Sequence, residues 1–276
     1  MNLLLKKIPI ILILIIVLNN SAFSQKRHTK DANPLMPGSV YLEMDYGFFL
    51  GLQGNSQSGK YFTQCDCEFT NGYGSGFIAG ALFERELFYG FKYGSALYIS
   101  SKALKANFFE KEDVKVTSET SGKSEFIPIN FENVSESFFL AFGVMPYLKF
   151  TPFRWMFARA GLSIDFPLSS KVTHTKELTQ RTVLLGSGEI GIINLEDPRC
   201  ESGKCKLEDR DFPDLVSPCL SITPAIGFNI PFSAEVNFSP LFQYFIPLSN
   251  ISEHGEQFRI SSWSIMLELR IALDDR

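Results

Sequence analysis

Hydrophobic and polar residues alternate along most of the chain with a period of two. The segment 38–50 shows it first, because Met44, Tyr46 and Phe48 share one face while Asp45 and Gly47 share the other. Such alternation is typical of a β-strand whose two faces differ, since successive side chains of a strand point to opposite sides. Seven more segments repeat the pattern, at 73–84, 87–100, 137–150, 154–168, 219–230, 234–246 and 259–273. The chain is therefore predicted to be all-β.

The composition of the two faces predicts which one is buried. One face carries large apolar side chains on nearly every segment, as Trp263, Ile265 and Leu267 do in the last one, whereas the other is rich in Gly, Ala and Ser. A soluble sandwich or lipocalin-like barrel also alternates, but its polar face points to water. Small residues suit a narrow interior better than a solvated surface. The pattern therefore favours a membrane barrel whose apolar side chains face lipid.

The connections between the segments are alternately short and long. The tight ones are 85–86, 151–153 and 231–233, and the longer ones are 53–72, 101–136, 169–218 and 248–258. Outer-membrane barrels have short periplasmic turns and long extracellular loops. We therefore predict an eight-stranded, antiparallel, closed transmembrane β-barrel over residues 38–273, with both ends in the periplasm.

The beginning of the chain predicts export. Lys6 and Lys7 precede an unbroken apolar run over 8–18, and Ser24 supplies a small residue before a predicted cleavage site. This layout is typical of a signal peptide, because a membrane anchor needs about 20 apolar residues. We expect a cleaved signal peptide at 1–24, a periplasmic tail at 25–37 and a short C-terminal tail at 274–276, with secretion through the inner membrane.

Composition narrows the surroundings of the mature chain. A formal net charge of −4, with no basic patch interleaved with aromatics, excludes nucleic acid as an expected partner. The 27 Phe residues are more apolar surface than one soluble core would absorb, so we expect outer-membrane lipid around the barrel. Aromatic residues at its two interfaces would be Tyr46, Phe91, Tyr93, Phe242, Tyr244 and Trp263.

One predicted strand–turn–strand pair carries a family resemblance. Residues 145–150 read Met-Pro-Tyr-Leu-Lys-Phe, and residues 157–163 read Phe-Ala-Arg-Ala-Gly-Leu-Ser. In these residues the chain resembles the eight-stranded OmpA/OmpX-like barrels and, among them, the outer membrane protein beta-barrel domain family, the PorT-like porin-family proteins of Bacteroidota, which are Gram-negative bacteria. The resemblance implies a cell-envelope location and insertion by the outer-membrane assembly machinery. Such barrels usually end on an aromatic residue, whereas the last predicted strand here ends at Leu273.

Charged residues recur on the predicted inward face. The interior of an eight-stranded barrel is just wide enough for side chains, and an unpaired buried charge is costly, so we expect these charges to pair and fill the lumen. The alternative is an ion-conducting path, although a pore would show one sign in excess. The predicted network consists of Glu43, Asp45, Lys92, Lys149, Arg159, Asp165, Glu235, Glu268 and Arg270.

The cysteines fall in predicted outer loops, where disulfides are allowed. Candidates are Cys65, Cys67, Cys200, Cys205 and Cys219. Cross-links from the first long loop to the third and a local Cys200–Cys205 bridge both fit, and connectivity cannot be deduced from spacing. A thiolate metal site is the alternative, with no His near either pair in sequence, so we expect no metal and no cofactor.

Catalytic groups are sparse. The histidines are His28 in the tail and His174 and His254 in or near outer loops, without a visible nucleophile–base pair. We therefore expect a non-enzymatic barrel with an envelope structural or surface-interaction role. A porin-like small-solute channel or a transport- or secretion-accessory barrel is the alternative, and an outer-membrane lipid or peptide hydrolase is the second.

Two local features complete the expectations. The third long loop, 169–218, contains β-prone runs at 182–185 and 190–195, which could extend the barrel as a hairpin and contact a surface partner, or be a mere insertion. Pro146, Pro224 and Pro240 lie inside predicted strands, where proline removes a hydrogen-bond donor, so we expect bulges or ladder breaks there.

Overall fold

The computed structural model describes residues 44–63, 67–88, 90–118, 122, 124–180, 182–185, 188–193, 199–201, 203–233 and 236–273. The predicted signal peptide, both tails and the charged residues Glu43 and Glu235 lie outside these described residues. Among the described residues, no helix is long and apolar enough to cross a membrane.

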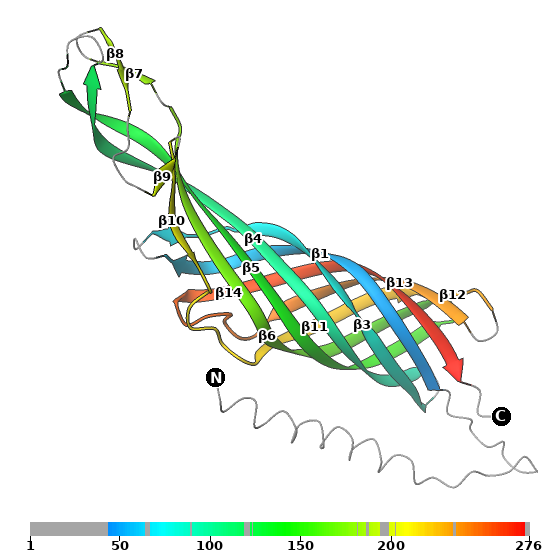
Figure 1. The fold of residues 1–276 in the computed structure, drawn as a ribbon. Helices are drawn as coiled ribbons and strands as arrows, with labels where there is room; N and C mark the ends of the chain where they lie inside the picture. Colours follow the sequence, from blue (N-terminus) through cyan, green and yellow to red (C-terminus); the bar gives the residue numbers. More distant parts are fainter. Residues whose placement is uncertain are drawn as a thin grey trace, which may run out of the picture. The chain divides into compact units, whose positions relative to one another are not determined.

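The main strands form a ring in which each is antiparallel to the next (Figure 1). The last strand pairs with the first from Met44 opposite Leu273 to Tyr61 opposite Gly255, which closes the ring. These ring strands are β1 (Met44–Phe62), β3 (Tyr73–Phe88), β4 (Phe91–Ser118), β5 (Ser124–Phe153), β6 (Met156–Leu178), β11 (Cys219–Phe228), β13 (Val236–Pro247) and β14 (Gly255–Leu273). The shorter strands are β2 (Glu68–Phe69), β7 (Thr182–Leu184), β8 (Ile190–Ile192), β9 (Cys200–Glu201), β10 (Lys204–Arg210) and β12 (Ile230–Pro231).

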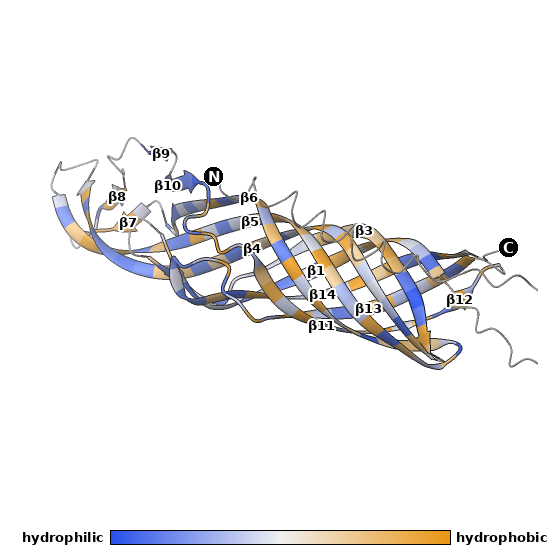
Figure 2. Cartoon of the chain, turned by 90° about the horizontal axis from the view of Figure 1, so that it is seen from below, coloured by the Kyte–Doolittle hydropathy of each residue, from blue (hydrophilic) through white to orange (hydrophobic). Residues whose placement is uncertain are grey.

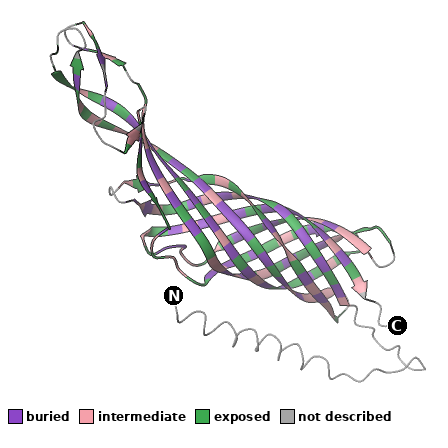
Figure 3. Cartoon of the chain, in the orientation of Figure 1, coloured by how far each residue is buried: buried purple, intermediate pink, exposed green. Residues whose placement is uncertain are grey.

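Large apolar side chains cover the outside of the ring, whereas charged and polar side chains are found inside it together with buried apolar ones. In β1, Leu50 and Leu52 are 65% and 72% exposed, whereas Gln53 is only 2% exposed. In β14, Ile265 is 61% exposed and Glu268 is fully buried. Figure 3 shows buried and exposed residues alternating along the ring strands, and Figure 2 shows apolar residues recurring along them. In these strands the residues predicted for each face lie on that face.

Strands β4 and β5 extend well beyond the prediction. Residues 101–136, predicted as a loop, belong mostly to these two strands, which remain paired as far as Thr117 opposite Ser124. Because β3 leaves β4 at Tyr73 opposite Lys105, residues 106–117 and 124–135 form what we call the β4–β5 extension (Figure 1). The predicted loop at 101–136 was wrong because the outer face of this extension carries polar side chains. Without a contrast between an apolar and a polar face, the alternation that indicates a strand is lost. The loop predicted at 53–72 was wrong for the same reason, since β1 continues to Phe62.

The third predicted loop also contains strands. β6 continues along the extension to Leu178 opposite Phe131, and β10 pairs with β6. The two β-prone runs form β7 and β8, which pair with each other and attach to β4 at Thr117 and Ser118. A small apolar cluster at this end contains Val116, Ile129, Phe131, Leu185 and Ile193. The hairpin expected in this loop is therefore present.

Two predicted tight turns were misplaced. Residues 151–153 are the end of β5, and the turn follows at Arg154 and Trp155. Arg85 and Glu86 are in β3, opposite Tyr93 and Lys92, and β3 ends at Phe88. Gly90 follows with a φ of 79°, a backbone conformation that glycine adopts without steric penalty. The chain therefore reverses at Gly90 and not at two charged residues, which remain in the β3–β4 pairing.

Each strand proline coincides with a gap in one ladder. Pro146 pairs with Ser95 on one side but lies in a gap between Val144 and Tyr147 on the β6 side. Pro224 is opposite Ala160, and the β11–β13 pairing skips it. Pro240 is opposite Leu267 and has no partner on the β11 side in the described register. The missing amide donor of proline accounts for these gaps.

Candidate functional site

The interior of the ring contains a network of buried charges, a few residues from the strand ends at the short turns. Lys149 Nζ donates to Glu84 Oε2 at 2.9 Å, and the hydroxyl of Tyr147 donates to Glu84 Oε1, also at 2.9 Å. Lys149 and Glu84 are 3% and 0% exposed. β5 contributes Tyr147 and Lys149 two positions apart, so the strand's period of two places both on the inward face.

Two arginines complete this network. Arg159 Nη1 donates to Glu268 Oε1 at 2.7 Å, while Arg270 contacts both Glu268 and, at 3.4 Å, Glu84. Phe157 receives cations against its ring, with Lys149 Nζ 4.5 Å and the Arg270 guanidinium 4.6 Å from its centroid. The network therefore joins three cations and two carboxylates, and the aromatic ring supplies cation–π stabilisation for part of the remaining positive charge.

Two further ion pairs lie inside the ring. Lys102 Nζ is 3.1 Å from Asp165 Oδ2, and the Tyr98 hydroxyl donates to Asp165 Oδ1 at 2.5 Å. Lys92 Nζ is 2.7 Å from Asp45 Oδ2. Every one of these charges has a partner within hydrogen-bonding distance, which is how proteins reduce the cost of burying charge.

The sequence pointed to most of this network and missed two members. The structure brings together Asp45, Lys92, Lys149, Arg159, Asp165, Glu268 and Arg270 in such pairs. It adds Glu84 and Lys102, which were not predicted. Glu84 ends a Gly-rich segment with weak alternation, and Lys102 falls in the region predicted to be a loop. The even spacing of Ile78, Gly80, Leu82 and Glu84 is the signal that could have placed Glu84 inward.

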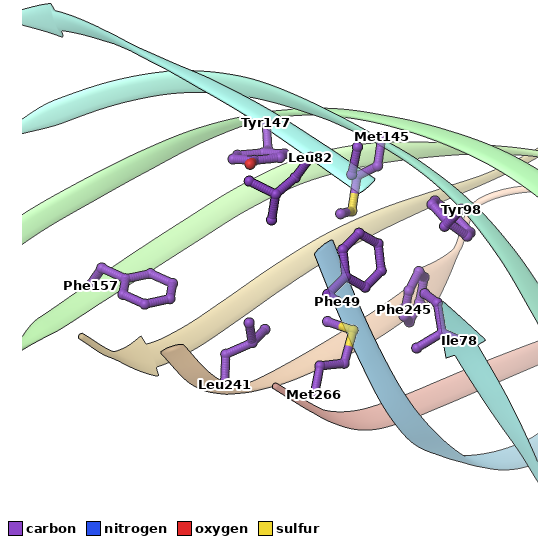
Figure 4. Packing of buried hydrophobic residues seen from close by; sticks show 11 residues of the cluster. Phe49, Ile78, Leu82, Tyr98, Met145, Tyr147, Phe157, Leu241, Phe245 and Met266 are labelled. Atoms are coloured by element: carbon purple, nitrogen blue, oxygen red, sulfur yellow. The ribbon is translucent and has the colours of Figure 1, made fainter. Parts of the chain in front are cut away.

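Apolar layers fill the space between and beyond these charges. In one cluster, Phe49, Tyr98, Met145, Phe245 and Met266 pack together inside the ring (Figure 4). This cluster also contains Ile78, Leu82, Ala96, Tyr147, Phe157 and Leu241. The interior is therefore packed with side chains from the ring strands, and apolar and ionic contacts alternate along it.

A second apolar cluster lies toward the β4–β5 extension. Phe212, from the segment after β10, packs against both Tyr61 and Phe258, with ring centroids 5.6 and 5.4 Å away. Ser170 Oγ accepts a hydrogen bond from the Phe212 backbone amide at 3.3 Å, which holds that segment inside the ring. The segment is also tied by the backbone bond from Val216 N to Ile251 O, so it covers this end of the interior.

His174 is buried rather than placed in a loop as expected. It lies in β6, where Thr63 Oγ1 is 3.1 Å from its Nδ1 and Asn133 Oδ1 is 3.0 Å from its Nε2. Asn133 Nδ2 donates to Glu110 Oε2, which turns the amide oxygen toward the imidazole. Nε2 therefore carries the proton and Nδ1 accepts from Thr63, as a neutral imidazole requires. Burial lowers the pKa of His174 to about 4.

His174 is enclosed by its neighbours. Both ring nitrogens of His174 are engaged, and the side chain is fully buried against Phe69. His254 lies in the bend between Ser252 and β14, where its backbone amide donates to Ser252 Oγ. Among the described residues, His174 and His254 are thus held by separate sets of contacts.

The cysteines divide into paired and unpaired groups. Cys200 and Cys205 form a disulfide between the adjacent strands β9 and β10, and Cys67 is also disulfide-bonded. Cys65 lies outside the described residues. Cys219 was predicted as a disulfide candidate, which was wrong: its thiol is free and buried, 3.2 Å from Val216 O, because β11 turns it inward. The described residues contain no group of three or more His, Cys, Asp or Glu that could hold a metal ion.

No protein-family model matches the sequence, and no curated protein matches it. Among solved structures, the attachment invasion locus protein Ail of Yersinia pestis is 9% identical with a TM-score of 0.31, over 83% of this chain and 99% of its own. Neisserial surface protein A is 8% identical with a TM-score of 0.31, over 81% of this chain and 96% of its own.

A third solved structure is the outer membrane protease OmpT of Escherichia coli. It is 7% identical with a TM-score of 0.31, and the match covers 85% of this chain and 99% of that protein. At such TM-scores none of these similarities assigns a function to this chain.

Proposed function

We propose that this chain is an integral outer-membrane protein whose ring is an eight-stranded closed transmembrane barrel. The single observation that supports this most is the reversed burial pattern: Phe48, Leu50 and Leu52 face outward in β1, and ionised side chains face inward. Leaving a large apolar side chain in water forgoes about 1.5–3 kcal/mol of burial free energy. Because outward apolar side chains recur on every ring strand, the summed loss of burial free energy would be prohibitive in water. In a membrane these side chains would contact lipid, and the loss would not arise.

The lumen of this barrel is proposed to be filled, so that the protein does not conduct. The ion pairs of Glu84 and Glu268 are buried beside one apolar cluster, the pair of Asp165 lies between that cluster and the second one, and Phe212 packs over one end. Ions crossing this interior would have to displace paired charges and aromatic rings together. A porin-like channel or transport-accessory barrel has less support from this packing.

The functional part is then proposed to be the β4–β5 extension with β6, β7, β8 and β10, outside the membrane. Short turns such as Arg154–Trp155 and Gly90 lie at the opposite ends of the same strands. Signal peptide, cleavage and assembly-machinery recognition belong to the same proposal, because an outer-membrane location requires export. We infer a non-enzymatic envelope or surface-interaction role, in which 169–218 contributes to contact with a partner.

Membrane integration is tested by folding the protein into liposomes and comparing gel mobility with and without heating. A folded barrel that shifts on heating and stays with vesicles after carbonate washing supports the proposal. A protein that stays soluble without lipid and sediments as a compact monomer would overturn it.

Orientation and conduction are tested separately. An epitope inserted at Gly122, between β4 and β5, should bind antibody on intact cells, whereas the same epitope at Arg154–Trp155 should bind only after permeabilisation. In planar bilayers the protein should give no discrete conductance steps, with protein-free detergent as the control. Steps in conductance would favour the channel alternative and leave the membrane proposal intact.

A further inference from the structure

The outer surface of the ring changes character at one level across four neighbouring strands. The pairings Tyr73–Lys105, Lys105–Glu136 and Glu136–Thr173 form a row from β3 to β6. On the side of this row toward the turns, outward residues of these strands are apolar, as in Phe77, Ile99 and Phe142. On the other side the exposed residues of β4 are mostly polar or charged, including Asn107, Lys111, Asp113 and Lys115, with Phe109 as an apolar exception.

A groove of about 410 Å³ lies across this change of character. Its small residues, Ser75 and Ala103, lie beside the larger Phe138, which is 42% exposed. Lys105 lies in the row, opposite Glu136, and Lys171 lies opposite Phe138; their side chains are 63% and 59% exposed. The groove therefore places the apolar Phe138 side chain next to two exposed lysines, Lys171 directly opposite it and Lys105 nearer the extension.

The acidic groups around these lysines leave the cations available. Lys105 Nζ is 3.2 Å from Glu136, and Lys171 Nζ is 2.9 Å from Asp209, which also pairs with Lys206. Three lysines thus meet two carboxylates, an excess of one positive charge. Exposed ion pairs of this kind are worth little, so an anion can recruit their lysines at small cost.

The charge is local to this part of the ring. At the same level, Tyr73 is opposite Ser56 in β1, and Ser56 is opposite Ser261 in β14. These neighbours are uncharged, so the lysines of β4 and β6 mark one sector of the circumference. A uniform ring of charge would not single out one position on the circumference for a bound anion.

We propose that this groove binds a lipid of the surrounding leaflet, with its phosphate at Lys105 and Lys171 and an acyl chain along Phe138. The inference rests on the proposed membrane location, because only there would the border between apolar and charged outer surface coincide with lipid head groups. Charge-assisted hydrogen bonds from ammonium to phosphate are among the stronger polar contacts in proteins. Tyr73, 64% exposed, would lie beside the head group.

The test is native mass spectrometry of the folded protein in detergent, titrated with dioleoyl phosphatidic acid. The variant pair Lys105→Gln and Lys171→Gln should weaken binding by about tenfold, a loss typical of one or two charge-assisted bonds. The matched control is Lys111→Gln with Lys115→Gln, which removes equal charge from exposed positions of β4 outside the groove and should change binding less than about twofold.

The alternatives give different results. Equal losses in both variant pairs would overturn the groove site in favour of general charge attraction, and so would unchanged binding in the groove variant. Competition by inorganic phosphate as strong as by the lipid, or equal binding of dioleoylglycerol, would overturn the lipid-phosphate assignment. Heat-modifiable mobility of every variant in liposomes is measured in parallel. Its absence in the unaltered protein would instead refute the proposed membrane barrel, and this inference with it.

Discussion

Arg159 and Glu268 are 109 residues apart in the sequence, yet Arg159 Nη1 donates to Glu268 Oε1 at 2.7 Å inside the ring. β6 and β14 are not paired with each other, so this contact crosses the interior rather than joining neighbouring strands. Arg270 joins the same carboxylate and also contacts Glu84. Removing one member of such a network leaves its partners as buried charges without a full counter-charge.

Glu84→Gln should lower the free energy of unfolding by about 3–5 kcal/mol, because Lys149 and part of Arg270 lose their buried counter-charge. The measurement is reversible urea unfolding in lipid vesicles. Glu68→Gln is the control, since Glu68 pairs with Lys60 on the exposed surface and should give little change. Equal effects of the two substitutions would show that the interior network is not special.

Phe157→Ala should lower the free energy of unfolding by about 3–5 kcal/mol, through an interior cavity and the lost cation–π contacts with Lys149 and Arg270. The same urea unfolding measures it. Phe109→Ala, which truncates a 66% exposed ring on the extension, should change stability by less than about 0.5 kcal/mol. A mild effect at Phe157 would mean that the interior can collapse around the gap.

Gly143→Val should disrupt the bond between Tyr98 and Asp165. A Cβ at Gly143 would lie 2.2 Å from Tyr98 Cζ, so the tyrosine ring must move. Overpacking of this kind costs about 1–3 kcal/mol. When Gly143→Val is combined with Tyr98→Phe, the loss of unfolding free energy should be less than the sum of the two single losses. The reason is that both substitutions remove the same hydrogen bond, the one between Tyr98 and Asp165. Additive losses would show that Gly143 does not act through Tyr98.

Acid should destabilise the contact around His174. Its pKa is about 4 when buried and 6.5 for the ordinary side chain, so unfolding takes up a proton as the pH falls from about 6.5 to about 4. The stabilisation is complete above that range and is lost within it, by at most about 3 kcal/mol. Urea unfolding at several pH values should show this slope, and His174→Gln should lack it. An identical slope in the variant would assign the dependence to other groups.

The all-β character and the facing of the strands were largely predictable from the sequence. Leu267 and Glu268, adjacent in β14, lie on opposite faces as alternation requires, and the apolar partner faces outward. The lengths of β4 and β5 were not predictable, because outside the apolar belt the outer face is as polar as the inner one. There residues such as Lys111 and Glu112 give no contrast by which to recognise a strand.

Part of the charged interior was also predictable. Lys149, Arg159 and Asp165 were placed inward by their position in alternating segments, but Glu84 and Lys102 were missed because their segments alternate weakly or were taken as loop. The pairing itself could not be read from the sequence, since Tyr98 reaches Asp165 across 67 residues. Likewise, nothing in its spacing indicated that Cys219 would be turned inward and remain a free thiol.

The sequence by itself determined that this chain forms strands with two different faces, and that the apolar face carries the larger side chains. It could do so because the alternation of side chains is a local property of an extended backbone. The tertiary structure decided which charges meet, how far β4 and β5 extend past the ring, and that Phe212 packs over one end of the interior. Those outcomes depend on ring closure and register, which bring Glu84, Arg159 and Glu268 together from strands that no local pattern connects.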